Sequence, residues 1–84
     1  SSHECLIDGR KVSLTIKEFA LLAELLRSVN KVRTREELLE NIWGYGYEGE
    51  TRTLDMHVRT LRGKLGDHAS KLVTVRGMGF KYEA

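Results

Sequence analysis

Two stretches in the first half of the chain carry apolar side chains at the three- and four-residue spacing of amphipathic helices. The first follows a capping-box pair, Thr15 and Glu18, and extends to about Asn30. Its expected core positions are Phe19, Leu22, Ala23, Leu25, Leu26 and Val29. The second helix is expected between another capping-box pair, Thr34 and Glu37, and the glycine at position 44. Its inward face is expected to consist of Leu38, Leu39, Ile42 and Trp43.

A third helix is expected from about Arg52 to Leu65, capped by Thr51 and stopped by Gly66. Four apolar side chains fall on one side of this helix within about 60° of one another, as in an ordinary core stripe. These are Leu54, Val58, Leu61 and Leu65. The opposite side carries no acidic residue and consists of Arg52, Met56, Arg59, Thr60 and Gly63. One side of the helix is therefore predicted to be buried, and the other to be exposed and basic.

Two β-hairpins are expected near the ends of the chain. Asp8-Gly9 is a dipeptide favoured in two-residue hairpin turns, and it separates the strand-like runs 4–7 and 10–14. A second hairpin is expected with strands at about 72–76 and 80–82, turning through residues 77–79. Residues 44–50 form a glycine-rich loop between the second and third helices. The prediction is an α+β fold with three helices, a short N-terminal β-hairpin and a C-terminal β-hairpin.

Length and composition limit the class of protein. Eighty-four residues are enough for one domain with a moderate core, so residues 1–84 are expected to form a single domain. Ser1 to His3 are candidates for residues added to the natural sequence, and the natural domain is expected to begin further upstream because a two-stranded sheet alone is marginal. The single cysteine, Cys5, excludes an internal disulfide and a cysteine-based zinc finger, which favours a cytoplasmic location. No apolar run approaches the roughly 20 residues that cross a bilayer, so no membrane contact is expected.

Positive charge is concentrated towards the C-terminus. The whole chain has a formal net charge of +2. Residues 1–50 contain seven Lys or Arg and nine Asp or Glu, whereas residues 51–84 contain seven and three. The basic half holds the third helix and the second hairpin, as expected of a nucleic-acid-binding surface. A solvated charged surface without a partner is the alternative explanation of the same asymmetry.

The third helix and the second hairpin together have the layout of a DNA-binding protein that places a helix in a major groove and a hairpin against the neighbouring minor groove. Arg76, beside the glycine turn, suits a narrow minor groove. Thr74 and Lys81 are candidates for phosphate contacts. Phe80 and Tyr82 are expected to pack beneath the hairpin rather than to stack on bases.

Three residues of the third helix each have two interpretations. Gly63 costs about 1 kcal/mol relative to alanine inside a helix, which either a close approach to DNA or a weak point near the helix end would explain. Asp55 is expected to orient Arg59 or Arg62, with a direct base contact as the alternative. His57 is either a half-buried structural side chain or a contact to a backbone phosphate.

Three separated stretches of the chain resemble the OmpR/PhoB-type winged-helix effector domains of bacterial two-component response regulators. They are LTIKEFALLAELL, VRTREELLENIWGYGYEGETRTLDMHVRTLRGKL and VTVRGMGFKY, and they span nearly all of residues 14–82. The resemblance implies a winged helix-turn-helix fold in which the third helix recognises DNA and the second hairpin is the wing. It places DNA contacts at Arg52, Met56, His57, Arg59, Thr60, Arg62, Thr74 and Arg76. It also implies that the loop carrying Tyr45, Tyr47, Glu48 and Glu50 meets RNA polymerase.

The resemblance implies further partners. In such proteins a receiver domain is phosphorylated by a sensor kinase and promotes dimerisation, and two effector domains then bind a direct repeat near a promoter. No receiver domain exists in these 84 residues. The chain departs from the family pattern in two ways. Thr60 stands where several relatives carry Arg, which is expected to weaken affinity and alter base choice, and the usual four-stranded N-terminal sheet is only partly represented before Leu14.

The alternative function is a winged helix used as a protein-interaction module, in which the second hairpin or the loop at 44–50 docks on a partner. DNA binding is expected to weaken steeply with salt, whereas a protein interface would respond far less. Catalysis is not expected, because no histidine pairs with Cys5 at a metal or nucleophile spacing and no glycine-rich phosphate loop opens a helix. No cofactor or metal is expected.

Overall fold

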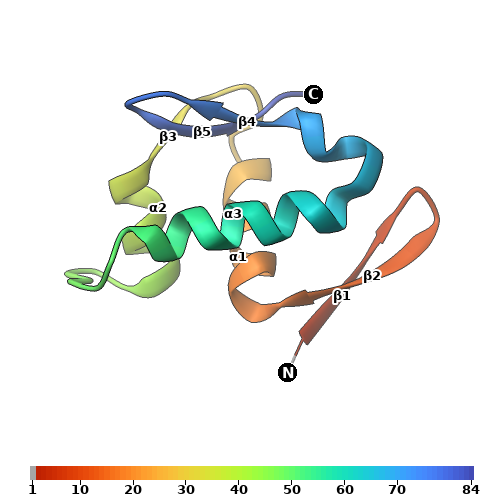
Figure 1. Cartoon of the computed structure of the whole chain (residues 1–84), viewed down its shortest axis with the longest axis horizontal. Coiled ribbons are helices and arrows are strands. Elements are labelled where there is room, and N and C mark those ends of the chain that lie inside the picture. The colour runs from red at the N-terminus through yellow and green to blue at the C-terminus, as the bar shows by residue number, and fades with distance from the viewer. Residues whose placement is uncertain (1) are drawn as a thin grey trace.

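The computed structural model describes the backbone of residues 2–84 and the side chains from Glu4 onward, and Figure 1 shows its arrangement. The elements in chain order are β1 (Ser2–Ile7), β2 (Arg10–Thr15), α1 (Ile16–Leu26), β3 (Arg33–Thr34), α2 (Arg35–Trp43), α3 (Arg52–Leu65), the 3-10 helix η1 (Gly66–Lys71), β4 (Leu72–Val75) and β5 (Gly79–Tyr82). The expected α+β architecture of three helices and two hairpins is confirmed. No helix within residues 2–84 is long and apolar enough to cross a membrane.

The N-terminal hairpin forms as the sequence predicts. β1 and β2 are antiparallel, and Ile7 pairs with Arg10 across the turn. Asp8 and Gly9 have φ angles of 53° and 81°, so both turn residues occupy the left-handed region that this short turn requires. Both strands run one or two residues beyond the predicted limits, because the pairing continues to Ser2 and Thr15.

Capping boxes start α1 and α2. The Thr15 hydroxyl accepts from the backbone N–H of Glu18 at 3.1 Å, and the Glu18 carboxylate accepts from the N–H of Thr15 at 2.9 Å. Thr34 and Glu37 repeat this exchange at 3.1 and 2.8 Å. Both predicted helix starts are therefore confirmed, and each cap satisfies two backbone donors that a helix terminus leaves without an intrahelical partner.

α1 differs from the prediction in its end and in the face that it buries. The helix stops at Leu26, before the expected limit, and the chain turns through Asn30, whose φ is 68° and whose N–H donates to the carbonyl oxygen of Tyr82 at 2.7 Å. Leu21 and Leu25 are fully buried. In contrast, Phe19, Leu26 and Val29 of the predicted core are 38%, 47% and 37% exposed. α1 carries two adjacent apolar stripes, and its rotation against α3 buries the stripe of Leu21 and Leu25, of which only Leu25 was expected in the core.

α3 crosses the middle of the molecule, with α1 and α2 on one side and the strands β4 and β5 along another (Figure 1). Its predicted bounds and its four predicted core residues are confirmed. The predicted cap is wrong: the Thr51 backbone is itself helical and its side chain makes no capping hydrogen bond. The core that surrounds α3 contains Leu14, Leu21, Leu25, Leu38, Leu39, Ile42, Leu54, Val58, Leu61, Leu65, Leu72 and Phe80.

The C-terminal hairpin, β4 and β5 with their connecting turn, is called the wing below. It belongs to a three-stranded antiparallel sheet in the order β3-β5-β4, in which Thr34 pairs with Gly79 and Arg33 with Phe80. A Cβ at position 79 would clash with the carbonyl oxygen of Arg33, so this pairing requires glycine. The two-residue strand β3 and the helix η1 were not predicted, because each is too short to show a periodicity. Phe80 is buried beneath the wing and Tyr82 half-buried, as expected.

Candidate nucleic-acid interface

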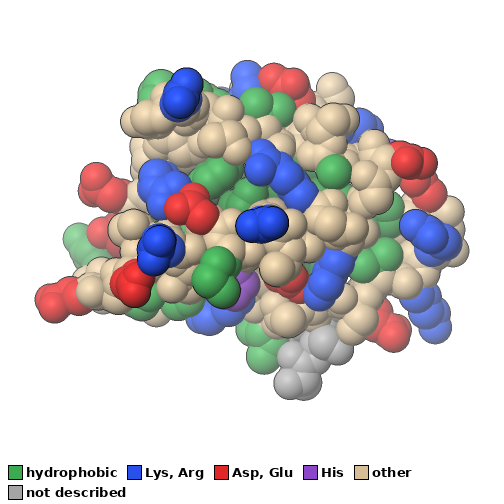
Figure 2. Space-filling model, in the orientation of Figure 1, with side chains coloured by type: hydrophobic (Ala, Val, Ile, Leu, Met, Phe, Trp, Pro, Cys, Tyr) green, Lys and Arg blue, Asp and Glu red, His purple; other side chains and the backbone are tan. Residues whose placement is uncertain are grey.

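The sequence predicts that one side of α3 is exposed and basic, and in the structure this side faces solvent. Five positions on this side are called the recognition face below, and all five are exposed: Arg52, Met56, Arg59, Thr60 and Gly63. Met56 is 63% exposed, although it is apolar. Figure 2 shows Lys and Arg side chains along this helix and on the surface between it and the wing. The stripe on the opposite side of α3 is in the core, so the recognition face is fixed by packing.

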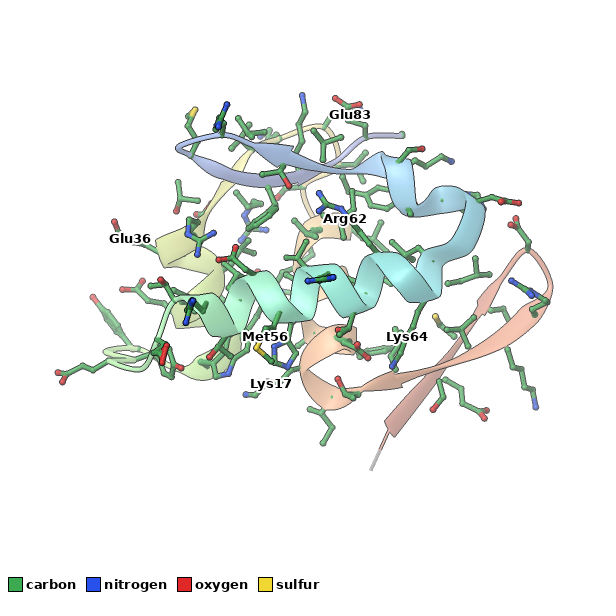
Figure 3. The ribbon with its side chains drawn as sticks, viewed as in Figure 1. Lys17, Glu36, Met56, Arg62, Lys64 and Glu83 are labelled. Carbon is green, nitrogen blue, oxygen red and sulfur yellow. The ribbon has the colours of Figure 1, made fainter. Side chains whose placement is uncertain are left out.

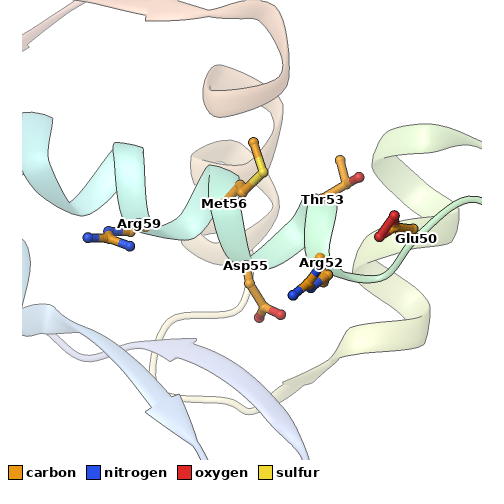
Figure 4. Close-up of a pocket in the computed structure, with 6 residues that line it drawn as sticks. All are labelled: Glu50, Arg52, Thr53, Asp55, Met56 and Arg59. Atoms are coloured by element: carbon orange, nitrogen blue, oxygen red, sulfur yellow. The ribbon is translucent and has the colours of Figure 1, made fainter.

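An open hollow of about 700 Å³ lies against the first turns of α3 (Figure 4). It is lined by Glu50, Arg52, Thr53, Asp55, Met56 and Arg59. Arg52 and Asp55 project from the same side of the helix, and Arg59 lies further along it (Figure 4). A carboxylate thus lies between two guanidinium groups on the exposed surface.

Asp55 does not orient Arg59 or Arg62, and that prediction is wrong. Its two oxygens accept from the guanidinium of Arg35 at 2.7 and 3.0 Å, and Arg35 also donates to the carbonyl oxygen of Thr51 at 3.1 Å. The hydrogen bond from Arg35 lowers the pKa of Asp55, and the same bond raises the pKa of Arg35. This bidentate pair joins the start of α2 to the start of α3 and neutralises the one acidic side chain of the helix.

Arg62 and Thr74, both predicted to contact DNA, are bonded to each other. Nε and Nη2 of Arg62 donate to the carbonyl oxygen of Leu72 at 2.9 and 2.7 Å, and Nη2 also donates to the Thr74 hydroxyl at 2.7 Å. Figure 3 shows Arg62 directed from α3 towards the wing and Lys64 directed to the opposite side of the helix. The two cations therefore leave the recognition face in opposite directions.

Arg76 follows β4 directly at the turn of the wing and is exposed. Gly77, with a φ of 77°, allows the tight turn beside it. A cavity of about 240 Å³ separates α3 from the wing, and Arg62, Thr74 and Arg76 are among its lining residues. Lys81, the other predicted phosphate contact of the wing, forms an ion pair with Glu83 at 3.0 Å. The structure thus places an exposed arginine at the wing tip, beside α3.

His57 is half-buried and fixed by two contacts. Its Nδ1 donates to the carbonyl oxygen of Thr53 at 2.7 Å, since a carbonyl can only accept. Its ring packs edge-on against Trp43 with centroids 5.1 Å apart. These contacts give His57 a structural role in holding α2 against α3, and they leave its Nε2 side for any contact outside the domain.

In the loop between α2 and α3, one of the four predicted contact residues packs against the domain and the other three are exposed to solvent. Tyr47 is half-buried, its ring lies 6.1 Å from that of Trp43, and its hydroxyl lies 3.5 Å from the carbonyl oxygen of Glu50. Tyr45 is 87% exposed, and Glu48 and Glu50 are exposed as well. Of the four predicted polymerase-contact residues, Tyr47 therefore anchors the loop, while Tyr45 and the two glutamates are exposed.

Sequence reasoning missed an ion pair beneath the recognition face. Glu18 is only 2% exposed, and its carboxylate accepts from Lys64 of α3 at 2.6 Å. Burial opposes ionisation of Glu18, but hydrogen bonds, above all that from Lys64, outweigh it and lower its pKa to about 2. The capping-box pattern explained Glu18 completely in local terms, so nothing in the sequence indicated a partner 46 positions away.

A helical core that exposes the basic side of its third helix beside a C-terminal β-hairpin defines the winged form of the helix-turn-helix DNA-binding class. Residues 9–82 match the family model described as "Transcriptional regulatory protein, C terminal". The chain belongs to this family, the OmpR/PhoB-type winged-helix DNA-binding effector domains of response regulators, which are domains of transcription regulators. The resemblance that the sequence motifs indicated is confirmed.

Individual relatives agree with this assignment. The chain is 43% identical over 84 residues to the sensory transduction protein RegX3 of Mycolicibacterium smegmatis, covering 96% of the chain and 37% of RegX3. Its fold is similar to that of the AdeR DNA-binding domain in complex with an intercistronic region, with a TM-score of 0.83, 30% identity, and coverage of 96% of this chain and 85% of that one. The RstA DNA-binding domain of Klebsiella pneumoniae in complex with the RstA box gives a TM-score of 0.83 at 31% identity, covering 95% and 82%. The chain spans little more than a third of the length of the curated relatives that it matches.

Proposed function

We propose that this domain binds a specific double-stranded DNA site, with α3 in a major groove and the wing in the flanking minor groove. The observation that carries the proposal is the recognition face: Arg52 and Arg59 are exposed on it, while the one carboxylate of the helix, Asp55, is neutralised by Arg35. A major groove about 12 Å wide admits an α-helix, and arginine reads guanine through paired hydrogen bonds. The relatives AdeR and RstA, whose DNA-binding domains were solved in complex with DNA segments, support the same role here.

The contacts divide by chemistry. Arg59, Met56 and Thr60 are proposed to meet base edges, because they occupy the centre of the recognition face. The proposed flanking contacts are Arg52, His57 and Thr74 along the major-groove side and Arg76 in the minor groove. The Thr74 hydroxyl accepts from Arg62, so its own proton remains for donation to a phosphate oxygen.

Selection of a preferred duplex from a randomised pool at about 150 mM salt tests the proposal. Arg59→Ala is expected to cost about 1–3 kcal/mol on the selected site and much less on a scrambled duplex. Arg27→Ala is the matched control for a lost charge, since Arg27 lies at the end of α1, is 75% exposed, and has its ion-pair partner, Glu24, on that helix. Affinity is expected to fall with salt by a slope of about −0.9 per phosphate contact. A flat slope and no enriched sequence would favour the protein-interaction module instead.

The full-length protein is proposed to act in the cytoplasm as a response regulator. An upstream receiver domain, phosphorylated by a sensor kinase, would bring two copies together on a direct repeat. The length of the curated relatives supports this, because the chain covers only 37% of RegX3 and 36% of ResD of Bacillus subtilis. Enrichment of a tandem repeat in the selected duplexes, with two domains bound per duplex, is the expected result. A selected site that holds one domain at saturation would contradict the dimeric arrangement.

The loop at residues 44–50 is proposed to contact RNA polymerase through Tyr45, Glu48 and Glu50, with Tyr47 as its anchor. Glu48→Gln with Glu50→Gln is expected to leave the affinity for the selected DNA unchanged within about twofold, because both side chains are exposed in the loop and neither belongs to the recognition face, although Glu50 lines the hollow beside it. The same variant, placed in the full-length regulator, is expected to lower transcription from a promoter that carries the site. Loss of DNA binding in the variant would show that the loop belongs to the DNA interface.

A further inference from the structure

We propose that Arg62 is a positioning residue for the wing: it fixes the spacing between α3 and the strand that carries Arg76, rather than contacting DNA through its guanidinium fork. This inference deepens the proposed function and rests on it for its DNA-binding consequences. It revises the sequence-based assignment of Arg62 as a direct DNA contact and makes it act through another residue.

The hydrogen bonds of Arg62 all reach β4. Nε and Nη2 donate to the carbonyl oxygen of Leu72, the first residue of the strand, and Nη2 donates to the hydroxyl of Thr74, its third. Thr74 and Arg76, which follows the strand directly, both line the cavity between the wing and α3. A single planar group therefore holds both the backbone and the side chain of the strand that leads to Arg76.

The donors that Arg62 uses form one edge of its guanidinium. Nε carries one hydrogen and Nη2 carries two, and the three recorded bonds use all three of them. Arginine forms paired hydrogen bonds with a guanine or a phosphate through this edge or through the Nη1–Nη2 edge. Both edges need Nη2, whose two hydrogens here face the wing. Only the two hydrogens of Nη1 remain for other partners.

A wing held in this way can place Arg76 accurately. The backbone ties between the wing and the rest of the domain reach β5 and the turn: β3 pairs with β5, the N–H of Arg35 approaches the carbonyl oxygen of Met78 at 3.4 Å, and the N–H of Asn30 donates to that of Tyr82. Arg62 instead joins β4, the strand that leads to Arg76, to α3 beside the cavity between them. Because a helix in the major groove fixes where the neighbouring minor groove lies, this spacing determines whether Arg76 reaches it.

A double-mutant cycle between Arg62 and Arg76 on the selected duplex tests the proposal. Arg76→Ala is expected to weaken binding about tenfold in the otherwise intact chain and less than about twofold when Arg62 is also replaced. Arg62→Lys keeps the charge but lacks the planar fork, so it is expected to behave as Arg62→Ala does. Losses that add independently, together with rescue by Lys, would identify Arg62 as a separate phosphate contact and overturn the inference.

A measurement on the free protein separates this inference from the proposed function. Backbone amide signals and heteronuclear relaxation of residues 72–79 are recorded without DNA for the unchanged chain and for Arg62→Lys. Increased mobility of the wing in Arg62→Lys, with unchanged signals from α1, is expected. Arg59→Lys is the matched control on the same helix and is expected to leave the wing unaltered, because Arg59 is exposed on the recognition face.

The two experiments fail in different ways. If the unchanged chain selects no duplex, the proposed function is wrong, and the relaxation data alone decide the structural claim. If the chain binds DNA but the wing of Arg62→Lys keeps the mobility of the unchanged chain, the positioning role is wrong while the DNA-binding function stands. Arg62→Lys retains a long side chain and its charge, so it gives a folded comparison where Arg62→Ala does not fold.

Discussion

In this domain, the role of a charged side chain depends more on the partner that it pairs with than on its position around a helix. Arg59 and Arg62 are three positions apart on α3, yet Arg59 is exposed while Arg62 is hydrogen-bonded to the wing. Asp55 lies one turn from Arg59 but pairs with Arg35 of α2. The number of unpaired guanidinium groups on α3 is therefore smaller than its sequence suggests, and the proposed function depends more heavily on Arg59.

Glu18 provides a prediction at this scale. Its ordinary pKa of 4.5 falls to about 2 in the folded chain, so the stability that it contributes is present above about pH 4.5 and is lost as the pH falls towards 2. Glu18→Gln is expected to lower the free energy of unfolding by about 1–3 kcal/mol at pH 7, because Lys64 loses its buried carboxylate partner. Urea unfolding from pH 7 to pH 2.5 measures both effects.

The variant is also expected to show a weaker decline in stability between pH 4.5 and 2.5 than the unchanged chain. Glu40→Gln, at an exposed position of α2, is the control for removing a carboxylate without removing a buried pair. Parallel acid limbs for the unchanged chain and Glu18→Gln would show that Glu18 is not the group that titrates.

At the scale of elements, the short strand β3 connects the wing to the body of the domain. It follows α1, precedes α2 and pairs with β5 through only two residues, Arg33 and Thr34. Arg33 is held in turn by Glu24 at 3.0 Å and Glu37 at 3.1 Å. The pairing brings the backbone of β5 so close to that of β3 that Gly79 has no room for a side chain.

Two glycines therefore predict opposite effects of the same substitution. Gly79→Ala is expected to destabilise the domain by about 2 kcal/mol or more, because the added methyl group meets a backbone carbonyl that cannot move without opening the sheet. Gly63→Ala is expected to stabilise it by about 1 kcal/mol, because its Cβ meets nothing and alanine favours the helix. Thermal and urea unfolding of both variants provide the comparison. A stabilised Gly79→Ala would show that β3 and β5 do not pair as described.

At the scale of the whole molecule, α3 is both the centre of the core and the proposed DNA-binding surface. Its inner stripe packs against α1, α2 and the wing sheet, while its outer side faces solvent. Three side-chain ties, from Glu18, Arg35 and the wing, hold it in place. These ties fix the orientation of α3 in the free domain, so the helix is expected to lose little conformational entropy when it binds DNA as proposed.

Native-state hydrogen exchange tests this view of the molecule. The amides of Val58 and Leu61 are expected to exchange through global unfolding, because α3 is packed on the core along its inner stripe. The amides of β1 are expected to exchange faster, since within residues 2–84 this strand pairs only with β2 and Leu6 on it is 70% exposed. Equal protection of α3 and β1 would contradict this order of stabilities.

The sequence by itself determined the three α-helices, the two hairpins and the exposed side of α3, but not β3 or η1. Capping boxes at Thr15 and Thr34, the Asp8-Gly9 turn and the helical spacing in α3 are signals between residues a few positions apart, and each acts through a local hydrogen bond or a fixed rotation per residue. The motifs also sufficed for the family. These features need no knowledge of what packs against them.

Only the tertiary structure decided which partners the charges take and which side of α1 is buried. Leu25 and Leu26 are adjacent and equally apolar, but the rotation of α1 against α3 buries Leu25 and leaves Leu26 exposed. Asp55 and Arg35 are 20 positions apart, and Glu18 and Lys64 are 46 apart. Whether such charges meet depends on the packing of whole elements, because a side chain a few ångströms long reaches only the partners that the fold brings beside it.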